Sequence, residues 1–313
     1  PGLVPIFDGR LPDGSRVNGT IPPVTPDGPT LTIRKFREDP LTMIDLVKFG
    51  TVNSRLAAMM WVWIEGLDSR PANFVIAGGT GSGKTTTLNC LGMFIPWHRR
   101  LLTVEDTAEL QVYHDHWLRM ETRRQRPDGT AEVDMNDCLK SSLRMRPDRI
   151  IVGEVRGPEA ATLLTAMNTG HDGSFGSLHA NTAQETVTRM INPPMNVPPI
   201  MLSGLDLIII QARLHINGKT ARKITEVAEI AGMEGDKPRL NIIWKYNATT
   251  DQIEETGIPS KLREIICKAA GVSPDVFEKH VSQRQAIIKD LAQRDIHDIQ
   301  TVTQVIQNFY ASR

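Results

Sequence analysis

A glycine-rich run that ends in Lys-Thr-Thr constrains the fold of this chain more than any other feature. The run is AGGTGSGKTTTLN, residues 77–89, and the apolar stretch FVIA leads into it. The phosphate-loop pattern G-x-x-x-x-G-K-[ST] is matched from Gly78 to Thr85, with an apolar strand pattern before it and a helical pattern after it. The sequence therefore predicts an α/β fold that binds a nucleoside triphosphate at this loop.

The residue types in this run fit phosphate chemistry. Glycines let the backbone curl until several N–H groups point inward, and the following helix adds the positive end of its dipole. We expect Lys84 to reach the β- and γ-phosphates and the Thr85 hydroxyl to ligate Mg²⁺. The residues predicted to bind the nucleotide in this run are Gly79, Thr80, Gly81, Ser82, Gly83, Lys84, Thr85 and Thr86.

Strand and helix patterns alternate along the middle of the chain. Apolar runs typical of buried strands cover residues 74–79, 100–106, 148–155 and 174–180. Helical patterns cover residues 54–67, 84–95, 133–145 and 157–170. Apolar strands joined by helices indicate a parallel sheet that is covered on both faces. We predict a P-loop NTPase core with a mostly parallel sheet over residues 39–255.

The two ends of the chain differ from this middle region. Residues 1–38 contain short alternating runs, and we expect them to be a remnant of a small α+β N-terminal domain whose earlier part precedes the sequence. Asp39 and Pro40 are expected to begin a helix that ends at Gly50. After residue 200, apolar runs predict strands added at a sheet edge. Residues 256–313 are predicted to be a C-terminal helical subdomain, with helices near 259–270, 274–291 and 298–311.

Two acidic residues follow predicted strands, where open α/β sheets place their ligands. Glu154 ends the run RIIVGE, and Glu105 lies in LLTVEDTAEL. A phosphate loop needs carboxylates for Mg²⁺ and for the attacking water. We assign Glu154 to the Mg²⁺ shell and its water, and Glu105 to orienting or deprotonating that water, although the residues alone also allow the reverse. The alternative for each is a solvated carboxylate at a strand end.

Two histidines, His171 and His179, lie in the segment TGHDGSFGSLHANT. A neutral imidazole there can hydrogen-bond a γ-phosphate or a carboxylate and so respond to hydrolysis. Their spacing alone is more typical of a structural pair than of a phosphate sensor. It gives no support for a zinc site, since no third ligand is near.

The charge balance argues against a dedicated nucleic-acid binder. Lys+Arg and Asp+Glu both number 36, so the formal net charge is zero, whereas duplex-DNA binders usually carry a basic excess. The three cysteines, Cys90, Cys138 and Cys267, lie far apart, and no pair has the spacing of metal ligands. We interpret them as reduced thiols.

Four stretches in the order GGTGSGKTT, LLTVEDTAEL, RMRPDRIIVGEVRGPEA and AMNTGHDGSFGSLHANTA cover roughly residues 75–190. In their order and their residues, these stretches resemble the type II/type IV secretion ATPase superfamily. That superfamily includes pilus assembly and retraction motors and the archaellum motor. The later segments NPPMNVPPIMLSGLDLIIIQ and ITEVAEI look like the archaeal branch of that superfamily. The resemblance implies a RecA-like C-terminal domain that clamps nucleotide against an N-terminal domain.

The resemblance also implies roles for particular residues. Lys84 and Thr85 match the phosphate and Mg²⁺ positions of the Walker A motif at 78–85. Glu105 matches the acid of the aspartate box, and Glu154 the acid of an atypical Walker B motif. His179 matches the histidine-box position, with His171 close by. The family uses N-domain arginines near the phosphates, and Arg16 and Arg34 are the residues expected to do so here.

For the whole protein, the resemblance implies an ATP- and Mg²⁺-dependent homohexamer at the cytoplasmic face of the cell membrane. Its expected partner is a membrane platform protein, through which the hexamer would associate with the membrane without a membrane-spanning segment. Its expected work is to assemble, secrete or rotate a pilus-like filament. A second hypothesis is a RecA-like nucleic-acid motor, such as a helicase or a conjugation ATPase, which DNA would stimulate. A third is a nucleotide-gated scaffold with little turnover.

Overall fold

The computed structural model describes residues 5–125, 129–216, 218–235 and 237–312. The chain divides into two compact units, one up to Pro40 and one from Leu41 onward. We had placed this boundary between residues 38 and 39. Each unit is described by itself below.

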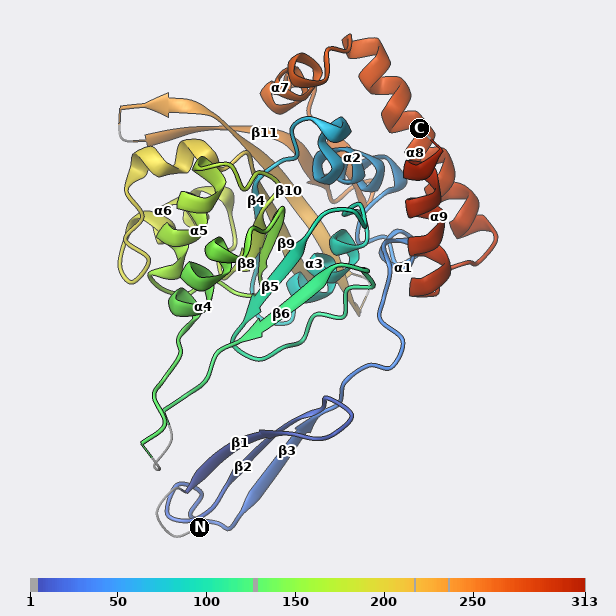
Figure 1. The fold of residues 1–313 in the computed structure, drawn as a ribbon. Helices are drawn as coiled ribbons and strands as arrows, with labels where there is room; N and C mark the ends of the chain where they lie inside the picture. The colour runs from blue at the N-terminus through green and yellow to red at the C-terminus, as the bar shows by residue number, and fades with distance from the viewer. Residues whose placement is uncertain (1–4, 126–128, 217, 236, 313) are drawn as a thin grey trace. The chain divides into compact units, whose positions relative to one another are not determined.

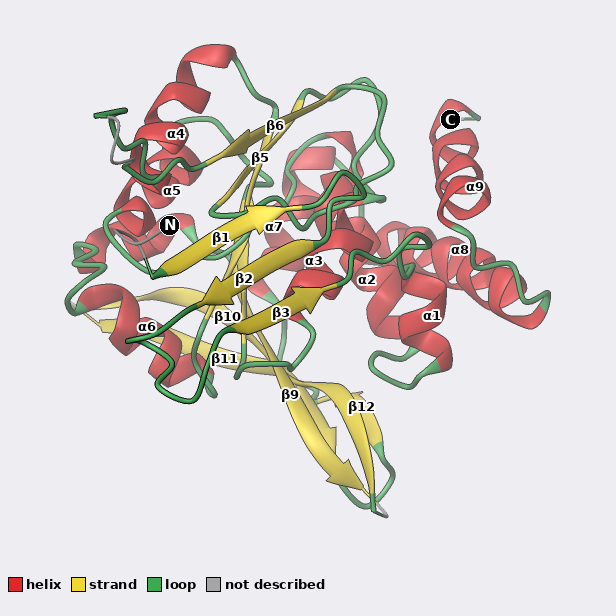
Figure 2. Ribbon diagram, turned by 90° about the horizontal axis from the view of Figure 1, so that it is seen from below, coloured by secondary structure: helices red, strands yellow, loops and turns green. Residues whose placement is uncertain are grey.

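The first unit is an antiparallel sheet of three strands, β1 (Ile6–Arg10), β2 (Arg16–Thr20) and β3 (Thr30–Arg34) (Figure 2). Its described part, residues 5–40, contains strands and turns but no helix. The pairing places Phe7, Gly19 and Leu31 in one row across the sheet. A Cβ atom on Gly19 would lie 2.1 Å from the Phe7 ring, so the aromatic side chain occupies the space that glycine leaves.

The second unit is built on a sheet of nine strands in the order β12-β11-β10-β9-β4-β8-β7-β5-β6 (Figure 1). The strands from β9 to β6 in this order run parallel, and β10, β11 and β12 continue the sheet in antiparallel fashion. The strands are β4 (Phe74–Ala77), β5 (Leu101–Glu105), β6 (Trp117–Glu121), β7 (Arg149–Val152), β8 (Phe175–Leu178), β9 (Leu207–Ile216), β10 (Lys219–Glu234), β11 (Lys237–Asn247) and β12 (Gln252–Glu255). The predicted α/β architecture with a mostly parallel sheet is confirmed.

Helices cover both faces of this sheet (Figure 1). On one side lie α4 (Met135–Ser142), α5 (Glu159–Asn168) and α6 (Ala183–Ile191). On the other side lie α1 (Met43–Lys48), α2 (Ser54–Glu65), α3 (Lys84–Gly92), α7 (Lys261–Ala270), α8 (Pro274–Gln293) and α9 (Ile299–Ala311). Short 3₁₀ turns occur at Gly66–Asp68, Leu143–Met145 and Pro199–Gly204.

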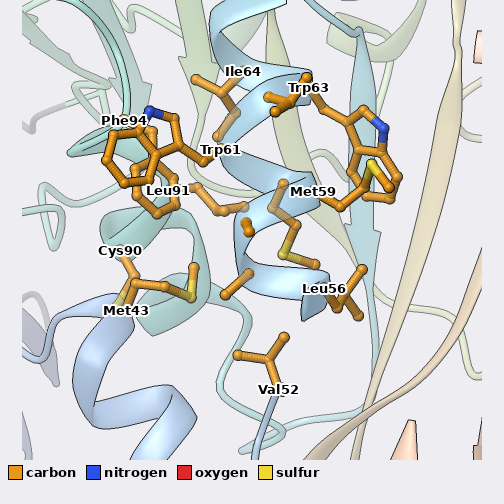
Figure 3. Close-up of a cluster of buried hydrophobic side chains, with 14 of the residues drawn as sticks. Met43, Val52, Leu56, Met59, Trp61, Trp63, Ile64, Cys90, Leu91 and Phe94 are labelled. Atoms are coloured by element: carbon orange, nitrogen blue, oxygen red, sulfur yellow. The ribbon is translucent and has the colours of Figure 1, made fainter. Parts of the chain in front are cut away.

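The central strands are buried because both of their faces are covered. Every residue of β4, β5, β7 and β8 is buried, which explains why these segments read as continuous apolar runs. Phe74 and Phe175 lie opposite each other on β4 and β8, and their rings stack 4.5 Å apart. Figure 3 shows part of the core on the α2 side, where Trp61 packs near Leu91 and Phe94.

The C-terminal helices belong to the same core as the sheet. Arg284 of α8 and Glu65 of α2 form a fully buried ion pair. The Arg284 guanidinium also lies 5.6 Å from the centre of the Trp61 ring, and the Trp61 indole donates a hydrogen bond to the Tyr310 hydroxyl. The boundary that we expected between residues 255 and 256 therefore does not separate two compact units.

The element boundaries differ from the sequence prediction in a few places. The first helix begins at Met43 and not at Pro40, because Thr42 and Asp45 form a capping box there. Gly50 follows this helix with φ of 66°, as its predicted role at the helix end requires. The three C-terminal helices lie within about two residues of their predicted positions. Strands β6 and β12 and helix α6 were not predicted.

Candidate functional site

Four neighbouring strands bring the phosphate loop, His179, Glu154 and Glu105 to one edge of the sheet. The strands lie in the order β4-β8-β7-β5 and run parallel, so their carboxyl ends meet at the same edge. The phosphate loop follows β4, and His179 follows β8. Glu154 follows β7, and Glu105 is the last residue of β5. This is the edge where open α/β sheets bind ligands.

The backbone of the phosphate loop requires its glycines. Gly81 and Gly83 adopt φ of 72° and 98°, a left-handed conformation that other residues rarely take. A Cβ atom on Gly78 would lie 2.1 Å from the backbone oxygen of Gln211 on the neighbouring strand β9. The loop therefore curls against β9, and helix α3 begins at Lys84, directly after it.

Lys84 folds back over the loop. Its Nζ atom donates hydrogen bonds to the backbone oxygens of Gly78, at 2.8 Å, and Gly79, at 3.1 Å. Burial lowers the pKa of Lys84 below its ordinary value, while the Glu154 carboxylate acts in the opposite sense. The hydroxyl of Ser82, also in the phosphate loop, is buried and has no hydrogen-bond partner. Lys84 can thus exchange its contacts with the loop for phosphate oxygens, and the unpaired Ser82 hydroxyl can bond a phosphate without losing a partner.

Glu154 lies in a cluster of charged groups. The Arg156 guanidinium donates to its Oε2 atom at 2.6 Å, and Nε2 of His179 lies 2.7 Å from its Oε1 atom. Burial alone would raise the pKa of Glu154, but the hydrogen bond from Arg156 and the charges of Arg156, His179 and Lys84 together lower it. Glu154 is therefore an ionised carboxylate whose Oε2 atom is hydrogen-bonded to Arg156, while its Oε1 atom lies close to His179 without a hydrogen bond.

Glu105 has the opposite environment. Its Oε1 atom accepts hydrogen bonds from the backbone N–H groups of Glu109, at 2.8 Å, and Leu110, at 3.0 Å. Its Oε2 atom is buried and has no partner. Burial raises the pKa of Glu105 above its ordinary value in spite of these hydrogen bonds. A Cβ atom on Gly153 would lie 2.9 Å from the Glu105 side chain, so Glu105 packs against the residue just before Glu154.

The remaining predicted residues are distributed unevenly. Thr85 and Thr86 lie half-buried in the first turn of α3, and Gly79 and Thr80 belong to the loop. His171 lies four residues before β8, and its Nδ1 atom is 3.1 Å from the backbone oxygen of Pro147, which precedes β7. It is therefore at the opposite edge of the sheet, and the structure does not bring it to the phosphate loop of its own chain.

The two predicted arginines belong to the first unit. Arg16 on β2 and Arg34 on β3 lie opposite each other, and Arg10 on β1 pairs with Arg16 on the other side. The three arginines thus form one row across the small sheet. Their assignment to the phosphates stays a prediction, because each unit is described only by itself.

The oxygen ligands at this edge fit Mg²⁺ in chemical type. The Thr85 hydroxyl and the Glu154 carboxylate are hard oxygen donors, which this cation prefers. Within the described ranges, no three His, Cys, Asp or Glu side chains converge as a metal site.

Sequence reasoning missed the contribution of strands β9 and β10. The side chain of Gln211 is buried, and it accepts a hydrogen bond from the Thr87 hydroxyl at 2.8 Å. Arg222 of β10 donates from Nε to the backbone oxygen of Gly81 at 3.0 Å. A polar Gln at the end of the apolar run LDLIIIQ was the available signal. Among the helices that the structure describes, none combines the length and apolar character needed to span a bilayer.

Comparison with known proteins places the chain in a family. The family described as Type II/IV secretion system protein matches residues 3–298. An uncharacterised protein of Methanocaldococcus jannaschii is 30% identical over 478 aligned positions, which cover 98% of this chain and 66% of the relative. The conjugal transfer protein TrbB of Rhizobium radiobacter is 37% identical over 237 positions, which cover 73% of this chain and 68% of that relative.

The solved structures include one that supports the fold. The ATPase DotB of Legionella pneumophila has a TM-score of 0.52 at 18% identity, over 92% of this chain and 69% of that one. The chain spans 66% of the length of the Methanocaldococcus relative above and 56% of a second protein from that organism. Given the extent of the family match, this chain belongs to the type II/IV secretion system protein family.

Proposed function

We propose that this chain hydrolyses ATP as the motor subunit of a type IV pilus-like or secretion machine. The observation that carries the proposal is that Lys84, Glu154 and Glu105 follow or end β4, β7 and β5, three parallel strands whose carboxyl ends lie at one edge of the sheet. A phosphate loop with two carboxylates at one edge supplies the groups that phosphoanhydride hydrolysis needs. The similar protein DotB of Legionella pneumophila is an ATPase, which agrees with this chemistry.

The environments of the two glutamates suggest a division of labour. Glu105 has a raised pKa and a buried oxygen without a partner, which suits a general base that accepts a proton from the attacking water. Glu154 has a lowered pKa and fixed position, which suits an ion that orients the water shell of Mg²⁺. Mg²⁺, when bound, would neutralise charge on the phosphates, with Thr85 as its direct protein ligand. His179, beside Glu154, would respond to the loss of the γ-phosphate through that carboxylate.

The work of this motor would come from a change in domain arrangement. In our proposal, a homohexamer at the cytoplasmic face of the membrane binds ATP at the phosphate loop of each subunit. Contacts to the γ-phosphate favour one arrangement, and their loss on hydrolysis favours the other. A membrane platform protein would pass the movement to an archaellum-like or pilus-like filament.

Hydrolysis is tested by measuring phosphate release with ATP and Mg²⁺ over a range of protein concentrations. We expect a rate per subunit that rises with concentration as the ring assembles. Lys84→Ala and Glu154→Gln should each lower the rate by about a hundredfold or more. The control Lys268→Ala, at an exposed position on α7, should not change it. Full-rate hydrolysis by Glu154→Gln at high dilution would count against the proposal.

A conjugation-type ATPase is a second candidate, because the TrbB relative is named for conjugal transfer. A motor that acts on DNA would show phosphate release stimulated by single- or double-stranded DNA, and binding that weakens steeply with salt. A filament motor would show neither. The zero net charge of the chain favours the filament motor.

A further inference from the structure

Strands β9 and β10 continue past the phosphate loop as a two-stranded ribbon. Strand β9 pairs with β4 only from Leu207 to Ile210, where β4 ends. From Gln211 to Ile216 it pairs with β10 alone, up to Lys219. Figure 2 shows β9 projecting beyond the central strands of the sheet, with β12 beside it. We call residues 211–216 and 219–224 the β9–β10 ribbon.

One face of the ribbon supports the phosphate loop. The Gln211 backbone oxygen lies against Gly78, and its side chain accepts a hydrogen bond from Thr87 of α3. Arg222 contacts the loop at two further glycines, Gly83 and Gly81. Its Cδ atom would lie 3.2 Å from a Cβ on Gly83, and its Nε donates to the Gly81 oxygen at 3.0 Å. The ribbon therefore contacts three of the loop's glycines.

Register places a second arginine beside the first. Arg213 lies directly opposite Arg222 in the antiparallel pair, so both side chains leave the same face of the ribbon. Like charges directly opposite each other destabilise a sheet. A Cβ on Gly81 would lie 3.6 Å from a terminal nitrogen of Arg213, so this guanidinium reaches the same loop residue.

The ribbon's own sequence contains no acid that could balance this pair. The sequence from Gln211 to Lys223 contains two arginines and two lysines but no Asp or Glu. Lys223 has its own partner, Asp251, at 3.0 Å. Arg213 forms no hydrogen bond or ion pair with any residue that the structure describes. An exposed guanidinium without a partner, opposite a like charge and above a phosphate loop, is positioned to bind an anion.

We propose that the β9–β10 ribbon forms a wall of the nucleotide site within the same chain, in which Arg213 binds a phosphate group of the nucleotide and Arg222 positions the phosphate loop. The inference rests on the proposed nucleotide site. Arg222 acts on the outside of the loop, since it bonds a carbonyl while the loop N–H groups serve the phosphates. Arg213 supplies charge, and bound phosphate relieves its repulsion with Arg222.

The test measures the affinity of a fluorescent ATP analogue and of the matching adenosine analogue without phosphates. Arg213→Gln should weaken the ATP analogue about tenfold, which is about 1.4 kcal/mol, and leave the adenosine analogue unchanged. Arg222→Lys keeps the charge but cannot reproduce the Nε bond to Gly81, and it too should weaken the ATP analogue. Lys219→Gln removes the same charge from the opposite face of the ribbon and should have no effect.

The thermal unfolding midpoint of each variant is also measured without nucleotide. A purely structural role of these arginines would lower the midpoint, whereas a role in nucleotide binding would leave it unchanged. Equal affinity of Arg213→Gln and the unaltered chain would overturn the role of Arg213. If Arg222→Lys binds the ATP analogue as tightly as the unaltered chain does, the positioning role of Arg222 is overturned. If the unaltered chain fails to bind the ATP analogue, or binds it independently of Lys84, the proposed function itself fails.

Discussion

The two edges of the nine-stranded sheet use polar side chains in opposite ways. At the amino edge, Asn73 precedes β4, and its Oδ1 atom accepts hydrogen bonds from the backbone of Gly173 and Ser174, before β8. Its Nδ2 atom donates to the Gly204 oxygen at 3.0 Å. Asp206, before β9, accepts hydrogen bonds from the Asn73 backbone and from Arg70.

The carboxyl edge leaves hydrogen-bonding capacity unused. Oxygen atoms of Glu105 and Ser82 are buried there without partners, whereas the unpaired buried atoms near the amino edge include the Nε nitrogens of Arg100 and Arg149. At the amino edge, both ends of the Asn73 amide and both oxygens of Asp206 are bonded. Burying an unpaired polar atom costs free energy. The side chains of Asn73 and Asp206 therefore link neighbouring strands at the amino edge, whereas oxygens of Glu105 and Ser82 at the carboxyl edge are available to a ligand.

The largest expected effect comes from Glu105→Gln. Loss of a general base should lower kcat about a hundredfold to ten-thousandfold. The variant should be no less stable than the unaltered chain above neutral pH, because glutamine still accepts the two backbone hydrogen bonds and removes a buried charge. Phosphate release and thermal unfolding at pH 8 check both, with Glu264→Gln on the exposed side of α7 as control. A stability loss with normal kcat would reverse the assignment of this residue.

At the amino edge the expected effect is on stability. Asn73→Ala leaves two backbone N–H groups without an acceptor between β4 and β8, so the free energy of unfolding should fall by about 3 kcal/mol. The kcat of the folded fraction should stay the same. Denaturant unfolding measures the loss, with Asn308→Ala on an exposed position of α9 as control. A kcat that falls as far as in Glu105→Gln would remove the distinction between the two edges.

A smaller effect is expected from pH. The pKa of Glu105 is raised by burial, so its ionised, active form is lost at a higher pH than for an ordinary glutamate. The rate should fall up to tenfold per pH unit below that pKa. Stability changes with the opposite sign: the protonated form is favoured by folding, so this contribution is present at low pH and lost as pH rises through the folded pKa. In Glu105→Gln, this acid limb of the rate profile should disappear.

Much of the site was predictable because its determinants are local. The loop at 78–85 needs only glycines, a lysine and the flanking strand and helix, all of which are contiguous. The difference between His171 and His179 could also be inferred, since the strand predicted at 174–180 begins after His171 and has His179 near its carboxyl end. A strand rises about 3.3 Å per residue, so residues on either side of β8 reach opposite edges.

Other contacts were not predictable, because they depend on pairing between distant segments. The Arg222 bond to Gly81 joins residues 141 positions apart and requires β9 to lie beside β4, and β10 beside β9 in a particular register. The burial of the C-terminal helices on α2 depends on the Arg284–Glu65 pair, which no local pattern indicates. The capping box at Thr42 was present in the sequence, but Asp39 and Pro40 offered a competing helix start.

The most direct test of the carboxyl edge is a structure of the intact ring with Mg²⁺ and a non-hydrolysable ATP analogue. Our account predicts that Lys84 leaves the Gly78 oxygen for a phosphate, and that a water in line with the terminal phosphorus lies about 3 Å from Oε2 of Glu105. The account is contradicted if Glu105 and Glu154 both remain remote from the terminal phosphate in every subunit of a closed ring.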